Sequence, residues 1–485
     1  MTAPARIGVA LCALATVAAA PSPALGAGGV RITAKPGLKP SFSTGVSDYV
    51  SKCGSEKPLQ LSVDAPTGDT VSVDGAPSKP GRFTASVALK AGQSTELRVR
   101  SSGRKTTHHV RCLPTDFPTW KFERPGQPRA QWYLFAPSSS HGGGPYTYHV
   151  ILMNGRGVPV WWRRAEPSPF NSLLLANGDI AWTRWYGDPF GMRDSSAWEF
   201  HRLDGTLVRT LQTAGSPTDT HDMQPLPNGN FLLITYRLRK GVNLAPYGES
   251  GTGGVFDSEI QELTPSGSVV WTWNSKDHIK PSESTTRSAR FRPDGRSGYD
   301  VFHLNSVSLD GKGGLVISAR HTDSLYRIER PSGKITWKLG GTHRPESLKV
   351  AGDPMSPTLG QQHDARVMPD GTITVYDNRS HISPPRGVRF KVDASAHRAT
   401  WLEQVTEPKV HSSGAEGSAR IIAGGNWVVS WGSSNVISEF TPSNRLVWRL
   451  RFEHDVTNYR ATPIPAGRLR ATALRHAMEL QFPRH

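Results

Sequence analysis

Long hydrophobic runs and acidic residues are both scarce in this sequence. Beyond the N-terminus no apolar stretch reaches the roughly 18 residues that a transmembrane helix needs, which excludes an integral membrane protein. The 40 acidic residues face 57 lysines and arginines, so the formal charge is +17. The 14 tryptophans and 16 phenylalanines provide ample apolar material for a core and argue against a disordered chain.

The first 26 residues have the features of an export signal. Arg6 supplies a positive start, residues 7–20 form a short apolar stretch, and small residues near Ala24 and Gly26 offer a cleavage site. We therefore expect residues 1–26 to be a signal peptide, with the mature chain beginning near Ala27. The protein should then be secreted or lie in the cell envelope.

Cysteine is rare, with three in the whole chain. Cys12 would leave with the signal peptide, so Cys53 and Cys112 remain as an even pair. In an oxidising compartment such a pair predicts one disulfide.

The positive charge is spread along the chain rather than clustered. Only the segment Arg468 to Arg475 is locally dense. Nucleic-acid binding needs basic residues gathered on one face, so this pattern does not favour it. A basic surface would instead attract anionic substrates or an acidic cell envelope.

Residues 30–114 read as a small β-sandwich domain. Short alternating runs such as Leu59 to Val63 and Thr70 to Val73 are separated by glycine and proline turns, as is typical of strands in a sandwich. A proline-rich linker over residues 113–120 follows.

A repeat runs through residues 120–463. In five copies a turn residue lies four positions before a tryptophan, and in a sixth copy an arginine replaces the tryptophan. The pairs are Gly157 and Trp161, Gly205 and Arg209, Gly267 and Trp271, Gly333 and Trp337, His397 and Trp401, and Asn444 and Trp448.

A second turn followed by an apolar strand precedes most copies, as in Asn177-Gly178 before Ile180 and Asn228-Gly229 before Phe231. Copies recur about every 47 to 66 residues, which is typical of four-stranded propeller blades with variable loops. We therefore expect an all-β protein with a six-bladed β-propeller at 120–463, in which segments from the two ends complete one blade. Residues 464–485 would form a basic tail, and the long insertion at 275–300 a lid-like loop.

Three predicted blades open with a histidine at the start of the inner strand: His221, His303 and His363. Arg320 ends a strand of the second of these blades. Inner strands converge on the propeller axis, so these side chains should meet near one small ligand. An arginine and several imidazoles would suit a tetrahedral oxyanion such as sulfate or phosphate. One neutral imidazole could attack sulfur or phosphorus, while the others neutralise charge and protonate the leaving group.

These motifs resemble the PAPS-independent bacterial arylsulfotransferase family, and most closely its shorter, actinobacterial-type branch. The segments that carry the resemblance are Asp300 to Ser306, Ile317 to His321, Gln361 to Ala365, and His221-Asp222-Met223. Their order and approximate spacing agree with the family.

The resemblance implies a ping-pong transfer of a sulfuryl group from a phenolic sulfate ester to a phenolic acceptor. His363 matches the nucleophile that becomes a sulfohistidine, and His303 a histidine that assists proton transfer. Asn305 and Arg320 match residues that bind the sulfuryl oxygens. His221 matches a further active-site histidine. No cofactor is expected, because a phenolate leaves readily without a metal.

Two other classes of function fit parts of the sequence. A propeller that only binds a ligand, such as a glycan or cell wall, would keep aromatic rims but would gain nothing from three histidines and an arginine. A metal-dependent lactonase or phosphoesterase is weakly supported, since neither carboxylate clusters nor a His-Glu-x-x-His spacing occurs.

Overall fold

The computed structural model describes residues 29–139, 148–187, 193–245, 251–286, 288–291, 297–454 and 456–484. The predicted signal peptide at 1–26, with Cys12, lies outside the described residues. Within them the protein is all-β, apart from one α-helix and short 3-10 helices. None of the described helices is both long and apolar enough to cross a bilayer.

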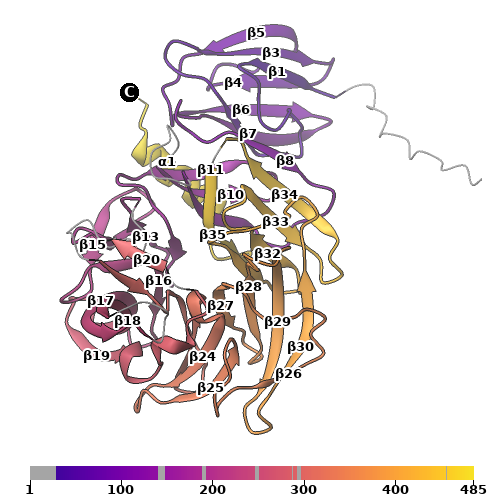
Figure 1. Ribbon diagram of the computed structural model, residues 1–485. Helices are drawn as coiled ribbons and strands as arrows, with labels where there is room; N and C mark the ends of the chain where they lie inside the picture. The colour runs from indigo at the N-terminus through magenta and orange to yellow at the C-terminus, as the bar shows by residue number, and fades with distance from the viewer. Residues whose placement is uncertain are drawn as a thin grey trace, which may run out of the picture.

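The N-terminal region contains two sheets, drawn in indigo and violet in Figure 1. One sheet has the order β1 (Arg31–Lys35), β3 (Leu59–Ala65), β5 (Gly81–Val87). The other has the order β2 (Asp48–Ser51), β7 (Arg104–Cys112), β6 (Ser94–Ser101), β4 (Thr70–Val73).

A single apolar core belongs to these two sheets. Strand β3 alternates as its sequence predicts, so that Leu59, Leu61 and Val63 are buried while the residues between them are not. Cys53 and Cys112 lie in the same core and form the predicted disulfide. The bond joins the segment after β2 to the end of β7.

Six further sheets, largely antiparallel, are built from described residues between 120 and 464 (Figure 1). The first contains β11 (Pro159–Arg164), β10 (His149–Asn154), β9 (Trp132–Ser139) and β35 (Val456–Ile464). The second contains β12 (Ser172–Leu174), β13 (Ile180–Arg184), β14 (Ala197–His201) and β15 (Leu207–Leu211). The third contains β16 (Thr218–Pro225), β17 (Phe231–Asn243), β18 (Thr252–Leu263) and β19 (Val269–Asn274), with β21 (Ser297–Asp300) and β20 (Ser288–Phe291) added beside β18.

The remaining three sheets follow the same plan. The fourth contains β22 (Leu304–Leu309), β23 (Gly314–Ala319), β24 (Ser324–Glu329) and β25 (Ile335–Gly340). The fifth contains β27 (His363–Val367), β28 (Ile373–Asp377), β29 (Arg386–Asp393), β30 (Arg398–Val405) and β26 (Lys349–Ala351). The sixth contains β31 (Ser418–Ile421), β32 (Trp427–Ser430), β33 (Val436–Phe440), β34 (Leu446–Phe452) and β8 (Trp120–Glu123). The whole is a β-propeller-like fold.

The repeated turn residue of the sequence occupies the same position in each of the six sheets. It lies one or two positions before the strand β11, β15, β19, β25, β30 or β34, and in all six places its φ is positive. Four of these residues are glycines, which adopt positive φ at little cost, while His397 and Asn444 adopt it at φ 47° and 56°. The repeat therefore records a left-handed turn before one strand of each sheet.

The two ends of the chain close the fold at two places, where the sequence predicts a single shared blade. Strand β35, near the C-terminus, pairs with β9, and strand β8, near the start, pairs with β34. Two neighbouring sheets each combine early and late segments.

The segment predicted as a basic tail contains the helix α1 (Ala471–Gln481). Its residues Leu474, Ala477 and Met478 are buried against β11. On another side, Arg475 forms an ion pair with Asp48 of the N-terminal region at 2.7 Å. The helix thus lies between the N-terminal region and the first of the six sheets (Figure 1).

Five of the six sheets each place one edge strand beside an edge strand of the next sheet. Strand β16 contacts β22, β22 contacts β27, β27 contacts β31, and β31 contacts β35. This arrangement determines which side chains meet.

Candidate active site

The three predicted histidines stand at the start of adjacent inner strands. His221 lies in β16, His303 directly precedes β22, and His363 is the first residue of β27. The rings of His221 and His303 are 4.9 Å apart, and the ring of Tyr459 lies 5.6 Å from His221 and 6.3 Å from His363. We call His221, His303, His363 and Arg320 the histidine cluster.

The ladder is irregular at each of these histidines. The register of β16 against β17 shifts between Thr218 and Met223, and that of β27 against β28 shifts between His363 and Arg366. Strand β22 shifts in the same way just after His303, which itself has φ 53°. Such irregularities turn side chains out of the regular alternation and are common beside active sites.

His221 is bound from behind by a carboxylate. Its Nδ1 lies 2.8 Å from Oδ2 of Asp219, and its backbone N–H donates to Oδ1 of the same residue at 2.8 Å. Burial raises the pKa of Asp219, and the neighbouring His221 opposes that shift. Both side chains are buried, so their interaction is little screened by water.

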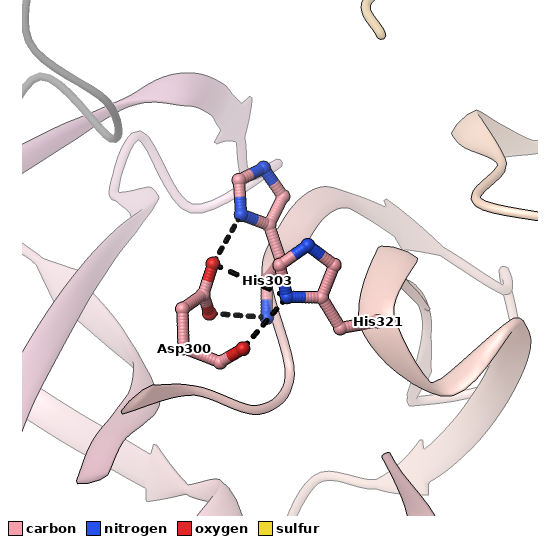
Figure 2. A group of neighbouring side chains, drawn as sticks. All are labelled: Asp300, His303 and His321. Carbon is pink, nitrogen blue, oxygen red and sulfur yellow. Dashed lines mark hydrogen bonds and ion pairs between the residues drawn. The ribbon is translucent and has the colours of Figure 1, made fainter. Parts of the chain in front are cut away.

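His303 has the same kind of partner, as Figure 2 shows. Its Nδ1 is 2.6 Å from Oδ2 of Asp300, and its N–H donates to Oδ1 at 3.0 Å. The same carboxylate lies 3.3 Å from Nδ1 of His321, whose Nδ1 also bonds the backbone oxygen of Asp300 at 2.7 Å. One aspartate therefore orients two imidazoles.

Arg320 is held by three acceptors. It donates to Nε2 of His321 at 2.7 Å, to Oε1 of Gln361 at 2.6 Å and to the carbonyl oxygen of Gly414 at 2.8 Å. Because Nε2 of His321 accepts this bond, the proton of His321 sits on Nδ1. Burial lowers the pKa of His321 to about 3, and the charge of Arg320 contributes to this shift. His321 thus stays neutral and positions the guanidinium.

His363 has a neutral partner instead. Its Nδ1 lies 2.7 Å from Oδ1 of Asn378, just after β28. The amide nitrogen of Asn378 donates to the carbonyl oxygen of Glu416 at 2.8 Å, which fixes the amide orientation. The Nδ1 of His363 must therefore carry the proton, and its Nε2 keeps a lone pair. Burial, and then the charge of Arg320, lower the pKa of His363 well below its usual value.

Asn305, predicted to bind sulfuryl oxygens, is buried, and its amide nitrogen donates to the carbonyl oxygen of Gln362 at 2.8 Å. The backbone carbonyl oxygen of Asn305 accepts a hydrogen bond from Arg460 at 2.7 Å. At least one of its two amide N–H bonds therefore serves the backbone next to His363. The structure gives Asn305 a clear role in holding β22 against β27.

A network of buried ions lies next to the histidine cluster. Asp222 and Asp364 directly follow His221 and His363, and their carboxylates bind the arginines of neighbouring strands. We call the set Asp222, Asp364, Arg366, Arg420 and Arg460 the buried ion network. Its ion pairs join β16, β27, β31 and β35 at 2.5 to 3.2 Å.

Glu416 also lies in this region, and the described contacts give it no arginine or lysine partner. Its Oε2 is buried and makes no hydrogen bond within the described residues. Burial raises the pKa of Glu416 to about 7, although the hydroxyl of Thr457 and the charge of His221 oppose the shift. A carboxyl with such a pKa changes its charge in the physiological range.

Among the described residues, Asp300, His303 and His321 place potential metal-binding atoms within 4.8 Å of one another. This set does not fit a metal ion, because the guanidinium of Arg320 lies against Nε2 of His321 and would repel a cation. The imidazole Nδ1 atoms are also bound to Asp300 itself. The arrangement is suited to anions.

The predicted insertion at 275–300 does border the histidine cluster. The hydroxyl of Thr286 accepts from the amide of Gln361 at 2.8 Å, and Gln361 in turn accepts from Arg320. Its last residue, Asp300, is the partner of His303. The insertion therefore contributes to the site rather than only covering it.

Sequence reasoning missed the partners of the histidines. Asp219 and Asp300 stand two and three positions before their histidines, so a search for carboxylates near each strand start would have found them. Asn378 is far from His363 in sequence and meets it only through the pairing of β27 with β28. No pattern in the sequence identifies it.

Comparison with known families gives one informative match. The family described as arylsulfotransferase (ASST) matches residues 176–453, which is more than half of the chain and includes every residue of the histidine cluster. None of the curated proteins matches the chain.

Similar solved structures are distant. A protein of unknown function from Bacteroides caccae is 13% identical with a TM-score of 0.40, covering 69% of this chain and 99% of its own. A selenomethionine-substituted virginiamycin B lyase from Staphylococcus aureus is 12% identical with a TM-score of 0.34, covering 71% of this chain and 100% of its own. Scores this low carry no argument about the present chain.

Proposed function

Because this chain belongs to the arylsulfotransferase family, we propose that it moves a sulfuryl group from a phenolic sulfate ester to a phenolic acceptor. The transfer is ping-pong, and His363 carries the group between the two half-reactions as a sulfohistidine. The reaction uses no nucleotide sulfate donor. Both substrates are small molecules.

The observation that supports this proposal most is the hydrogen bond from Nδ1 of His363 to Asn378. It leaves the lone pair of Nε2 available, and burial keeps the ring neutral by lowering its pKa. A neutral imidazole with a fixed tautomer is what nucleophilic attack on a sulfate ester requires. The other imidazoles nearby have carboxylate partners and are less suited to this role.

In the first half-reaction, Nε2 of His363 forms a bond to sulfur as the bond from sulfur to the phenolic oxygen breaks. The electron pair of the broken bond stays on that oxygen, and protonated His303 gives it a proton from Nε2. The products are the free phenol and His363 sulfonated on Nε2. In the second half-reaction the acceptor oxygen attacks sulfur, its proton returns to His303, and Nε2 recovers its lone pair.

Positive charge near the transferred group lowers the barrier in both directions. Arg320 is fixed by His321 and Gln361, so its guanidinium needs no reorganisation to meet the sulfuryl oxygens. We assign His221, held by Asp219, to the same oxygens or to the bridging oxygen. Asn305 can reach an oxygen only with the N–H bond that Gln362 leaves free.

The rest of the chain has roles consistent with this proposal. We propose that the six sheets at 120–463 are the blades of a six-bladed β-propeller, and that residues 30–114 are a β-sandwich domain held by the disulfide. We also propose that residues 1–26 direct export, since a buried disulfide suits an oxidising compartment. The protein would then act outside the cytoplasm.

Turnover of p-nitrophenyl sulfate with and without added phenol tests the proposal. We expect p-nitrophenol release to depend on the acceptor, to survive chelation of metals, and to disappear in His363→Ala. A peptide containing sulfonated His363 should be trapped when acceptor is omitted. If aryl sulfates bind but none of a panel of them is turned over, the protein is better explained as a binding propeller. If phosphate esters are hydrolysed and chelators abolish that hydrolysis, a metal-dependent esterase is favoured.

A further inference from the structure

The three histidines of the cluster are all anchored through Nδ1, so each presents Nε2 on its opposite edge. Their acceptors differ, however. Asp219 and Asp300 offer carboxylates to His221 and His303, at 2.8 and 2.6 Å. Asn378 offers a neutral amide oxygen to His363 at 2.7 Å.

The charge of the acceptor decides how readily each ring takes up a second proton. A carboxylate stabilises an imidazolium, so the ring beside it can take up and release a proton at Nε2. An amide oxygen accepts one hydrogen bond but offers no negative charge, so it orients the ring and opposes the lowering of its pKa less strongly than a carboxylate would. The sequence of this chain places the neutral acceptor at only one of the three rings.

The side-chain amide of Asn378 cannot flip. Its nitrogen donates to the carbonyl oxygen of Glu416 at 2.8 Å and to the hydroxyl of Ser413 at 3.2 Å. A carbonyl oxygen can only accept, so the amide nitrogen must face Glu416 and the amide oxygen must face His363. The tautomer of His363 is therefore set by a backbone group outside the histidine cluster.

We infer that Asn378 is a positioning residue that keeps one proton on Nδ1 of His363 through both half-reactions, while Asp219 and Asp300 let His221 and His303 exchange theirs. This inference rests on the proposed sulfuryl transfer. It assigns a role to Asn378 that neither motif nor spacing in the sequence indicates.

The reason for an amide at this place is clearest in the second half-reaction. Once Nε2 carries the sulfuryl group, the ring with its Nδ1 proton is an imidazolium. When sulfur moves to the acceptor, the bond from Nε2 breaks, the electron pair stays on the ring, and the leaving group is neutral imidazole. A carboxylate at position 378 would form a stronger hydrogen bond with the Nδ1 proton and draw it away from the ring. The leaving group would then gain imidazolate character, which makes it more basic and slower to leave.

Other charged and titratable groups also act on His363. Arg320 faces it from the segment after β23, His221 from β16 and His303 from the segment before β22, and all three oppose its protonation. The ring of Tyr459 lies against it from β35. None of these groups would change in a substitution of Asn378.

The test is Asn378→Asp, which preserves the shape of the side chain and adds a negative charge. Release of p-nitrophenol in a single turnover reports the first half-reaction, and acceptor-dependent turnover reports the second. We expect the single-turnover burst to persist at alkaline pH. The acidic limb of its pH–rate profile should move to higher pH by about one unit or more. Transfer to phenol should slow about tenfold or more. The trapped sulfohistidine should also live longer. Asn444→Asp, at an exposed turn, is the matched control and should behave like wild type.

Three results would overturn the inference: a wild-type pH limb and wild-type transfer in Asn378→Asp, loss of the burst at every pH in a natively folded variant, or the wrong tautomer in the wild type. The tautomer is read from ¹⁵N chemical shifts of the histidine rings in unmodified protein, with His363→Gln to assign the signal. We expect neutral His363 protonated on Nδ1, and protonation on Nε2 would contradict this. That measurement needs no activity, so it decides on Asn378 even if no aryl sulfate reacts and the proposed function fails.

Discussion

The histidine cluster and the buried ion network lie side by side on neighbouring strands but differ in how their charged and titratable side chains are partnered. His221 and Asp222 are neighbours in sequence, as are His363 and Asp364. Each histidine is held through Nδ1 by an uncharged or acidic acceptor, whereas each aspartate is surrounded by arginines. The ion network balances every carboxylate it buries. The histidine cluster instead gathers three imidazoles and a guanidinium around one place, each oriented by a hydrogen bond.

The pKa shifts of two buried carboxyls express this difference. Burial by itself raises the pKa of both Asp364 and Glu416. Arg420, Arg366 and Arg460 reverse the shift at Asp364, whose pKa is lowered, whereas Glu416 has no such partner and its pKa rises to about 7. The partner charge, more than the depth of burial, decides whether a carboxyl is structural or titratable here.

The largest effect should come from breaking the ion network. Asp364→Asn leaves Arg420 and Arg460 without their shared carboxylate, and losing one partner of a buried ion network costs about 3–5 kcal/mol. We expect the urea midpoint of unfolding to fall accordingly. Asp370→Asn, on an exposed turn, is the control. Equal stability of both variants would show that the network is not what holds the inner strands together.

The next effect concerns the proton on His303. Asp300→Asn keeps an acceptor near Nδ1 but removes the charge that stabilises the protonated ring, so we expect about a 100-fold loss of kcat/KM for phenyl sulfate. The loss should be much smaller for p-nitrophenyl sulfate, because p-nitrophenolate leaves without a proton. A uniform loss for both esters would mean that Asp300 only shapes the site. Thermal unfolding of the variant separates this from a folding defect.

A smaller effect should appear in the pH dependence of stability. The pKa of Glu416 in the folded protein is about 7, above its usual value of 4.5. A raised carboxyl pKa means that its contribution to stability is complete below pH 4.5 and is lost as the pH rises through 7. Glu416→Gln removes this loss, so the variant should be more stable than wild type by about 2 kcal/mol at pH 8 and by much less at pH 5. Denaturation in urea at the two pH values measures the difference, and a gap independent of pH would contradict the shift.

The sequence predicts the framework of the molecule better than the partners within it. The turn residue before each repeated strand is visible because positive φ selects glycine, asparagine or a few others, and Gly157, Gly267 and Asn444 mark such turns. The phase of the repeat then locates the three histidines at the start of adjacent strands.

Features that depend on pairing across the fold were not predictable in this way. Asn378 meets His363 only because β27 and β28 pair in one register. The basic composition of residues 464–485 predicts a tail, yet Leu474, Ala477 and Met478 in helix α1 follow the spacing of a helical apolar face. Its eleven residues are too few to form a stable helix alone, and burial against β11 makes the difference.

The smallest effect concerns a side chain that contacts both the histidine cluster and the buried ion network. The ring of Tyr459 packs against His221 and His363, while its hydroxyl donates to the carbonyl oxygen of Asn305 at 3.2 Å and accepts from Arg460. Tyr459→Phe keeps the ring and removes the hydroxyl, so stability should fall by about 1 kcal/mol.

Activity of Tyr459→Phe should stay close to wild type, since Arg460 still bonds Asn305 at 2.7 Å and the site-facing ring is unchanged. Single-turnover rates and urea midpoints on the same preparation compare the two effects directly. If the first half-reaction fell together with stability, the hydroxyl would couple the ion network to the orientation of His363. Unchanged rates would instead show that the Tyr459 hydroxyl contributes to stability and takes no part in the proton transfers of the histidine cluster.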